Sequence, residues 1–184
     1  MRSDAGLTCV RVAFFRNLNL GQRRSHSPTS AELVDAFARV GVPDARNCRS
    51  NGTVIFTAPG GTEQARAVVR ILGEVCGYSD AVLVRSARWV SKVARRLPDR
   101  PGINVTLFDG RADPGLPLPW IEPTTGLEIL HLDHRHAITA WPADAASGDP
   151  CGPVLARIMA TPTTTRSAGT ITLLADRLTG LAAS

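Results

Sequence analysis

The order of strand-like and helix-like segments in the first half of the chain limits its fold more than any other feature. Residues 8–15 form a short apolar run with β-branched and aromatic members, which is typical of a buried strand. Helix signals follow, because Thr29 and Glu32 have the spacing of a capping box and Gly41 marks a C-terminal end. The remaining segments are strands at 45–49 and 53–58, a helix capped by Thr62 and ending at Gly77, and a strand at 81–85.

These segments have the order βαββαβ, which is typical of a ferredoxin-like module with two helices on one face of a four-stranded sheet. The pair Asn51-Gly52 between the middle strands favours a two-residue hairpin turn, since both residues tolerate positive φ. Apolar residues at helical spacing are predicted to pack against the sheet. They are Leu33, Phe37, Val68 and Leu72.

The second half of the chain is less regular. A strand is predicted at 103–109, a hairpin at 127–133 and 136–141, a short helix from Pro153, and a last helix at 167–178. We predict an α+β fold with two ferredoxin-like modules. Residues 1–97 carry the βαββαβ unit plus one helix, and residues 103–184 form a smaller, degenerate α+β unit.

Charge is distributed unevenly along the chain. Residues 1–100 have a net charge of +8, whereas residues 101–184 have −3. This asymmetry predicts either an acidic partner for the first half or a basic half that faces an acidic half. All the basic residues except Lys92 are arginine, a bias that a GC-rich genome also produces. The arginine content alone therefore does not establish guanidinium chemistry.

Several function classes lack their sequence signals. No apolar run approaches the roughly 20 residues that span a bilayer, and no signal peptide is recognisable, so we expect a cytoplasmic protein without a membrane partner. The scattered cysteines lack zinc-site or redox spacing, which favours buried thiols and leaves Cys48 as the one candidate nucleophile. No nucleotide-binding loop, Gly-x-Ser-x-Gly motif or diagnostic carboxylate pair is present, so we expect no cofactor.

Three segments carry a family resemblance. They read Arg-Asn-Leu-Asn-Leu-Gly at 16–21, Ser-Asn-Gly-Thr-Val-Ile-Phe at 50–56, and Thr-Thr-Arg-Ser at 164–167. In order and spacing they resemble the bacterial family called domain of unknown function 1697, over nearly the whole chain. The resemblance implies paired ferredoxin-like modules and no established general activity. Asn17 stands where the family usually has a glycine, so a function of a glycine-rich turn is not carried over.

Polar side chains near the first strand end and the hairpin are candidate ligand-binding groups, because they offer several donors to an oxygen-rich ligand. The alternative is that the asparagines serve turns. Arg166 precedes the last predicted helix and is a candidate anion-binding residue, or else one half of a structural Arg–carboxylate pair. The candidates near the first strand end and the hairpin are Arg16, Asn17, Asn19, Asn51 and Thr53.

Histidines supply the candidates for acid–base and metal chemistry. His26, in the polar loop after Gly21, is the candidate catalytic residue because histidine titrates near neutral pH; a simply exposed histidine is the alternative. The segment His-Leu-Asp-His-Arg-His at 131–136 contains metal-binding residue types. We predict no metal site, because Asp133 to Arg135 suits a hairpin turn and no helical His-x-x-x-His spacing is present.

Three functions remain open. The first is a cofactor-free enzyme or binder of a small anionic or oxygen-rich molecule, such as a cyclase or isomerase for an oxygenated acyl or polyketide-like intermediate. Its pocket is expected between the modules, near Arg166, and its basic surface would suit an acidic carrier protein. The second is nucleic-acid binding by the basic half, which the 5% aromatic content disfavours. The third is a noncatalytic interaction module.

Overall fold

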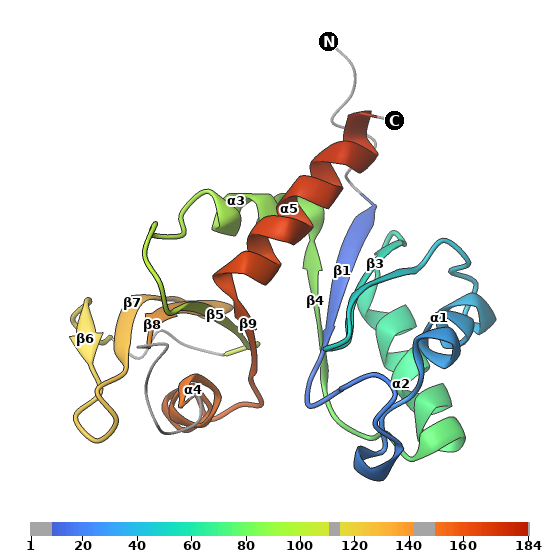
Figure 1. Ribbon diagram of the computed structural model, residues 1–184, viewed down its shortest axis with the longest axis horizontal. Helices are drawn as coiled ribbons and strands as arrows, with labels where there is room; N and C mark the ends of the chain where they lie inside the picture. Colours follow the sequence, from blue (N-terminus) through green and yellow to red (C-terminus); the bar gives the residue numbers. More distant parts are fainter. Residues whose placement is uncertain (1–8, 111–114, 142–149, 184) are drawn as a thin grey trace. The chain divides into compact units, whose positions relative to one another are not determined.

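A computed structural model describes residues 9–110, 115–141 and 150–183. The fold is α+β, as predicted, with two antiparallel sheets (Figure 1). The chain divides into two compact units, Met1–Ser91 with Arg177–Ser184, and Lys92–Asp176. The division falls inside two helices, α3 (Ala87–Ala94) and α5 (Ala168–Ala183). Among the described helices, none has the length and apolar character needed to span a bilayer.

The first unit contains the predicted order of elements. Its strands lie in the order β2-β3-β1-β4, and all neighbours are antiparallel. Two helices cover one face of this sheet (Figure 1). The elements are β1 (Val10–Phe15), α1 (Ser30–Arg39), β2 (Arg46–Arg49), β3 (Thr53–Thr57), α2 (Thr62–Cys76) and β4 (Val82–Ser86).

The core of the first unit lies between this sheet and its two helices. All four side chains predicted to be buried there are fully buried and belong to one apolar cluster, which confirms the helical spacing argument. Phe37 of α1 is central, because its ring packs against Phe15 at 6.2 Å and Phe56 at 5.0 Å between centroids. Such aromatic pairs add to the free energy of burial.

Two local predictions for the first unit are wrong in detail. Thr62 is the first residue of α2 rather than its cap, because the chain enters the helix at Gly61, whose N–H donates to Gln64 Oε1 at 3.0 Å. The β2–β3 loop has three residues, and of the Asn51-Gly52 pair only Gly52 has positive φ, at 67°. A third prediction is confirmed, since Thr29 and Glu32 form the capping box of α1.

The second unit contains a five-stranded sheet in the order β6-β7-β8-β5-β9. Helix α4 (Cys151–Met159) packs on one face, and it begins two residues before the predicted Pro153. Strands β6 and β9 were not predicted, because β6 is too short and β9 too polar to carry an apolar pattern. The strands are β5 (Ile103–Leu107), β6 (Trp120–Ile121), β7 (Glu128–Leu132), β8 (His136–Ala140) and β9 (Thr164–Ser167).

Glu122 links the β6–β7 turn to α4 through hydrogen bonds. Its carboxylate is buried and accepts hydrogen bonds from Thr124 N–H (3.0 Å), Thr125 N–H (2.7 Å) and Thr125 Oγ1 (2.8 Å). Arg157 of α4 donates to the other oxygen at 2.7 Å. The hydrogen bonds from Thr125 outweigh the opposing effect of burial and lower the pKa of Glu122 from 4.5 to about 2.

Replacing Glu122 with glutamine is expected to lower the stability of the second unit in a pH-dependent way. Because the folded pKa is depressed, the contribution of the carboxylate is complete above pH 4.5 and is lost as the pH falls toward about 2. The unfolding midpoints of wild type and Glu122→Gln should therefore differ most near neutral pH and converge in acid. Glu74→Gln, at an exposed position on α2, should show no such pH dependence.

Candidate ligand-binding site

The end of β1 and the β2–β3 turn lie side by side in the first unit. The N–H of Phe15 donates to the carbonyl of Gly52 at 2.9 Å, and the N–H of Leu20 donates to the carbonyl of Ser50 at 2.8 Å. Glycine permits this approach, because a Cβ at position 52 would lie 2.9 Å from the Cβ of Phe15. The structure thus brings together the two polar segments that the sequence singled out.

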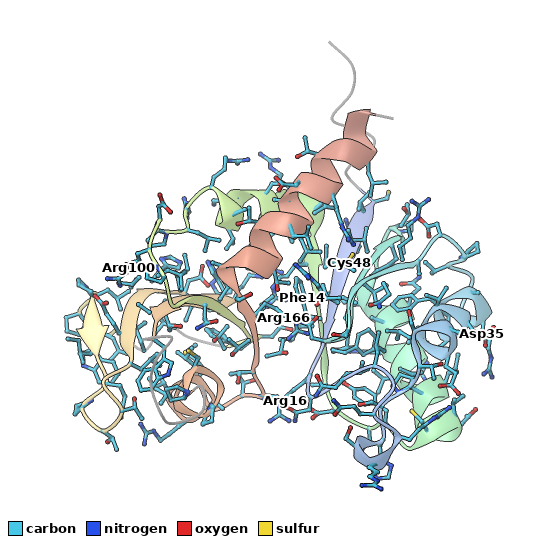
Figure 2. The ribbon with its side chains drawn as sticks, in the orientation of Figure 1. Phe14, Arg16, Asp35, Cys48, Arg100 and Arg166 are labelled. Carbon is cyan, nitrogen blue, oxygen red and sulfur yellow. The ribbon has the colours of Figure 1, made fainter. Side chains whose placement is uncertain are left out.

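Arg16 and Asn17 both contact Asp80, in the segment before β4. Nη1 of Arg16, which Figure 2 labels just beyond β1, lies 2.9 and 3.0 Å from the two carboxylate oxygens. The amide of Asn17 donates to Asp80 Oδ2 at 2.8 Å, and its φ of 51° is a turn conformation that asparagine tolerates. The hydroxyl of Tyr78 donates to the carbonyl of Arg16 at 2.7 Å. These contacts anchor the loop, and ligand binding by Arg16 and Asn17 stays a prediction.

The other polar candidates of the first unit fall into two groups. Thr53 is buried and its hydroxyl donates to Asn51 Oδ1 at 2.8 Å, a contact that orders the turn. Asn19 is exposed, and its backbone carbonyl accepts from the N–H of Gln22 at 3.1 Å. Asn19 therefore lies at the entrance to the loop that follows it.

That loop, residues Gly21 to Ser25 and called here the basic loop, lines an open cavity of about 470 Å³. Arg23 and Arg24 are both exposed and both line it. The guanidinium of Arg23 pairs with Glu32 of α1. A hydrogen bond from the N–H of Thr29, with a further contribution from Arg23, holds the pKa of Glu32 below its usual value. Arg23 is thus paired with a carboxylate, and Arg24 is the second guanidinium that lines the cavity.

His26 follows the basic loop and packs against the C-terminal end of α2. Its Nδ1 lies 3.2 Å from the carbonyl of Cys76, and the Cys76 thiol donates to the carbonyl of His26 at 3.2 Å. A carbonyl only accepts, so this contact places the hydrogen of the neutral ring on Nδ1. Nε2 is then the nitrogen with the lone pair, and the residue is exposed. His26 is next in sequence to the residues that line the cavity, and a catalytic role for it stays a prediction.

Arg166 belongs to the second unit and lies on β9 (Figure 2), two residues before the first residue of α5. The side chain is buried, and Nη1 donates to Thr164 Oγ1 and to the carbonyl of Thr165, each at 2.8 Å. Both contacts are within its own strand. Binding of an anion by Arg166 stays a prediction.

Sequence reasoning missed Asp80 and did not give Arg24 a role. Asp80 is 64 residues from Arg16 in the chain, and the two meet only because β1 and β4 pair. No local pattern indicates such a pairing. Arg24 carried a signal, since it follows the motif at 16–21, but the cavity that it lines is visible only in the fold. Cys48, the candidate nucleophile, is buried.

Comparison with known proteins identifies a matching family and a similar solved structure. A family described as "Protein of unknown function (DUF1697)" matches residues 10–116. A solved structure, of the conserved bacterial protein SP0830 from Streptococcus pneumoniae, is similar with a TM-score of 0.63 and 15% sequence identity, over 93% of this chain and 98% of that chain. At that identity the likeness shows the fold alone. No curated protein matches the chain.

Proposed function

Since the chain belongs to the DUF1697 family of proteins of unknown function, we propose a function from its own side chains: it binds a small anionic or oxygen-rich organic molecule at the basic loop. The observation that carries this proposal is the cavity of about 470 Å³ lined by Arg23 and Arg24. Its volume lies within the range of small-molecule sites, and guanidinium groups bind carboxylates through paired donors. The basic loop lies within the matched residues 10–116.

The hydrogen bonds around the basic loop support a preformed site. The N–H of Gly21 donates to the carbonyl of Pro28 at 2.8 Å, and the carbonyl of Gln22 accepts from Ser25 at 3.0 Å and Ser27 at 3.3 Å. A loop that is held in this way loses less conformational entropy when a ligand binds. The contact between Arg23 and Glu32 adds a side-chain link from the loop to α1.

Replacing Arg24 with alanine should weaken ligand binding by about 10- to 100-fold, because a hydrogen bond to a charged group contributes roughly 1.5–3 kcal/mol. Citrate is a suitable first probe, since it combines carboxylates with a hydroxyl. Its affinity for wild type and variant can be measured by calorimetric titration at fixed ionic strength.

Arg66→Ala is the matched control, because Arg66 is exposed on α2 in the same unit and its removal changes the net charge equally. Arg66→Ala should leave the affinity unchanged. Equal losses in the two variants would contradict a localised site. Equal losses together with steep salt dependence would instead favour nucleic-acid binding through the overall charge.

The proposal extends to catalysis through His26. A cyclase or isomerase for an oxygenated acyl intermediate needs a positioned ligand, one acid–base group and a group that stabilises negative charge. His26 supplies the acid–base group, and Arg24 supplies the positive charge. The observation that favours this extension is the contact of Nδ1 with the carbonyl of Cys76, which leaves Nε2 as the proton acceptor.

A further inference from the structure

Three side chains of the β7–β8 hairpin, in the second unit, gather at its turn. They are His131, Asp133 and His136, and one nitrogen or oxygen atom of each lies within 4.8 Å of the others. The pairing of Leu132 with Ala137 places Asp133 opposite His136 across the turn. Residues directly opposite share a face, and so do residues two apart in a strand. The spacing His-x-Asp-x-x-His in a hairpin therefore puts all three side chains on one face.

The distances within this cluster suit a single small ion. Nε2 of His131 lies 3.4 Å from Asp133 Oδ2, and Nδ1 of His136 lies 3.0 Å from Asp133 Oδ1. The two imidazole rings are 4.7 Å apart between centroids. With metal–ligand bonds of about 2.0–2.1 Å, the ligands of a tetrahedral ion are roughly 3.3–3.4 Å apart. The two distances involve different oxygens of Asp133, so the partly exposed His131 would have to rotate to bring one donor atom of each residue to this separation.

The backbone holds the carboxylate in place. Asp133 Oδ1 accepts from the N–H groups of Arg135 at 2.7 Å and His136 at 2.9 Å, so its second oxygen remains directed toward His131. The turn is also attached to the segment that follows β5, because the N–H of Phe108 donates to the carbonyl of Arg135 at 3.1 Å.

Exposure differs among the three side chains in a way that suits a reactive or exchangeable ion. The side chain of His136 is 4% exposed, whereas those of His131 and Asp133 are each 37% exposed. One ligand would thus be anchored in the unit, and the other two reach solvent. A water molecule or a ligand oxygen has access to the remaining position.

We propose that His131, Asp133 and His136 form a binding site for a first-row divalent metal ion, with Zn²⁺ as the best match. Zinc and the other first-row divalent ions bind sets of two imidazoles and one carboxylate, whereas Mg²⁺ and Ca²⁺ prefer oxygen ligands throughout. Three protein ligands leave a coordination position open, as in catalytic rather than structural zinc sites. This cluster belongs to the second unit, whereas the basic loop belongs to the first.

The first test is calorimetric titration of Zn²⁺ into the full chain prepared without a histidine tag. Wild type should bind one equivalent with saturation, and Mg²⁺ should not compete. His131→Ala should weaken binding at least about 100-fold, since loss of an outer-shell partner of a metal ligand already costs 10- to 100-fold. His134→Ala is the matched control, because this exposed histidine of the same turn is outside the cluster, and its affinity should equal that of wild type.

Asp133→Asn is the second variant, because the amide oxygen can still accept the two backbone hydrogen bonds that hold the turn. It should fold and lose zinc affinity. Absence of saturable binding to wild type would overturn the proposal. So would binding that survives His131→Ala, as expected for a site made by the thiols of Cys9 or Cys76, or an equal loss in His134→Ala.

Discussion

Replacing His26 with glutamine is expected to slow protein-catalysed proton exchange at a bound β-keto acid by about 10²- to 10⁴-fold, the usual contribution of a positioned acid–base group. Glutamine can still donate to the carbonyl of Cys76, so the contact with α2 can persist while the imidazole is lost. Acetoacetate is the probe, because it is anionic and carries exchangeable hydrogens next to a carbonyl. Exchange with solvent deuterium can be followed by proton NMR at saturating probe.

Two controls distinguish catalysis by His26 from an effect on ligand binding and from the loss of any exposed histidine. Arg24→Ala should raise the acetoacetate concentration needed for half-maximal exchange, because it weakens binding. His134→Ala should leave the rate unchanged. If wild type does not accelerate exchange above buffer, or if His26→Gln matches wild type, the catalytic extension fails. The binding proposal is tested separately by citrate titration of Arg24→Ala.

Replacing Gly102 with alanine is expected to destabilise the second unit by roughly 3–5 kcal/mol, the sum of backbone strain and overpacking. Gly102 has a φ of 75°, and a Cβ there would lie 1.9 Å from the carbonyl oxygen of Trp141. That oxygen is a backbone atom just beyond β8, so it cannot rotate away as a side chain would. Urea denaturation followed by circular dichroism would measure the loss.

Gly126→Ala is the control that isolates the strain from the overlap. Gly126 also has a φ of 75°, but nothing lies within 4 Å of the position that its Cβ would occupy. Only the cost of the left-handed conformation, roughly 1–2 kcal/mol, is expected. If the two variants lose equal stability, the overlap with the carbonyl oxygen of Trp141 does not contribute to the destabilisation by Gly102→Ala.

The candidate site could be predicted only in part. The sequence identified Asn19 and His26 as polar residues of the first loop region, and it identified the histidines at 131–136 as metal-binding residue types. It could not predict the ion pair between Arg16 and Asp80, because these residues are 64 positions apart in the chain. It also could not identify the cavity of the basic loop, since a cavity depends on how neighbouring segments pack.

The cluster of His131, Asp133 and His136 depends on the same hairpin turn that led the sequence to predict no metal site. The sequence predicted that Asp133 to Arg135 forms a hairpin turn, and the structure has that turn. The segment lacks the helical His-x-x-x-His spacing, in which side chains four residues apart meet. In a hairpin the turn itself brings His136 opposite Asp133, so the same residues meet through a different geometry.

The sequence by itself determined the order βαββαβ of the first unit, the capping box of Thr29 and Glu32, and the burial of Phe37. These follow from periodicity and from contacts between residues close in the chain, which act wherever the segment lies. The tertiary structure alone decided the strand identity of β6 and β9, the pairing of Arg16 with Asp80, and the need for glycine at position 102. Each depends on a partner that is distant in sequence, and such a partner is chosen only when the whole sheet packs.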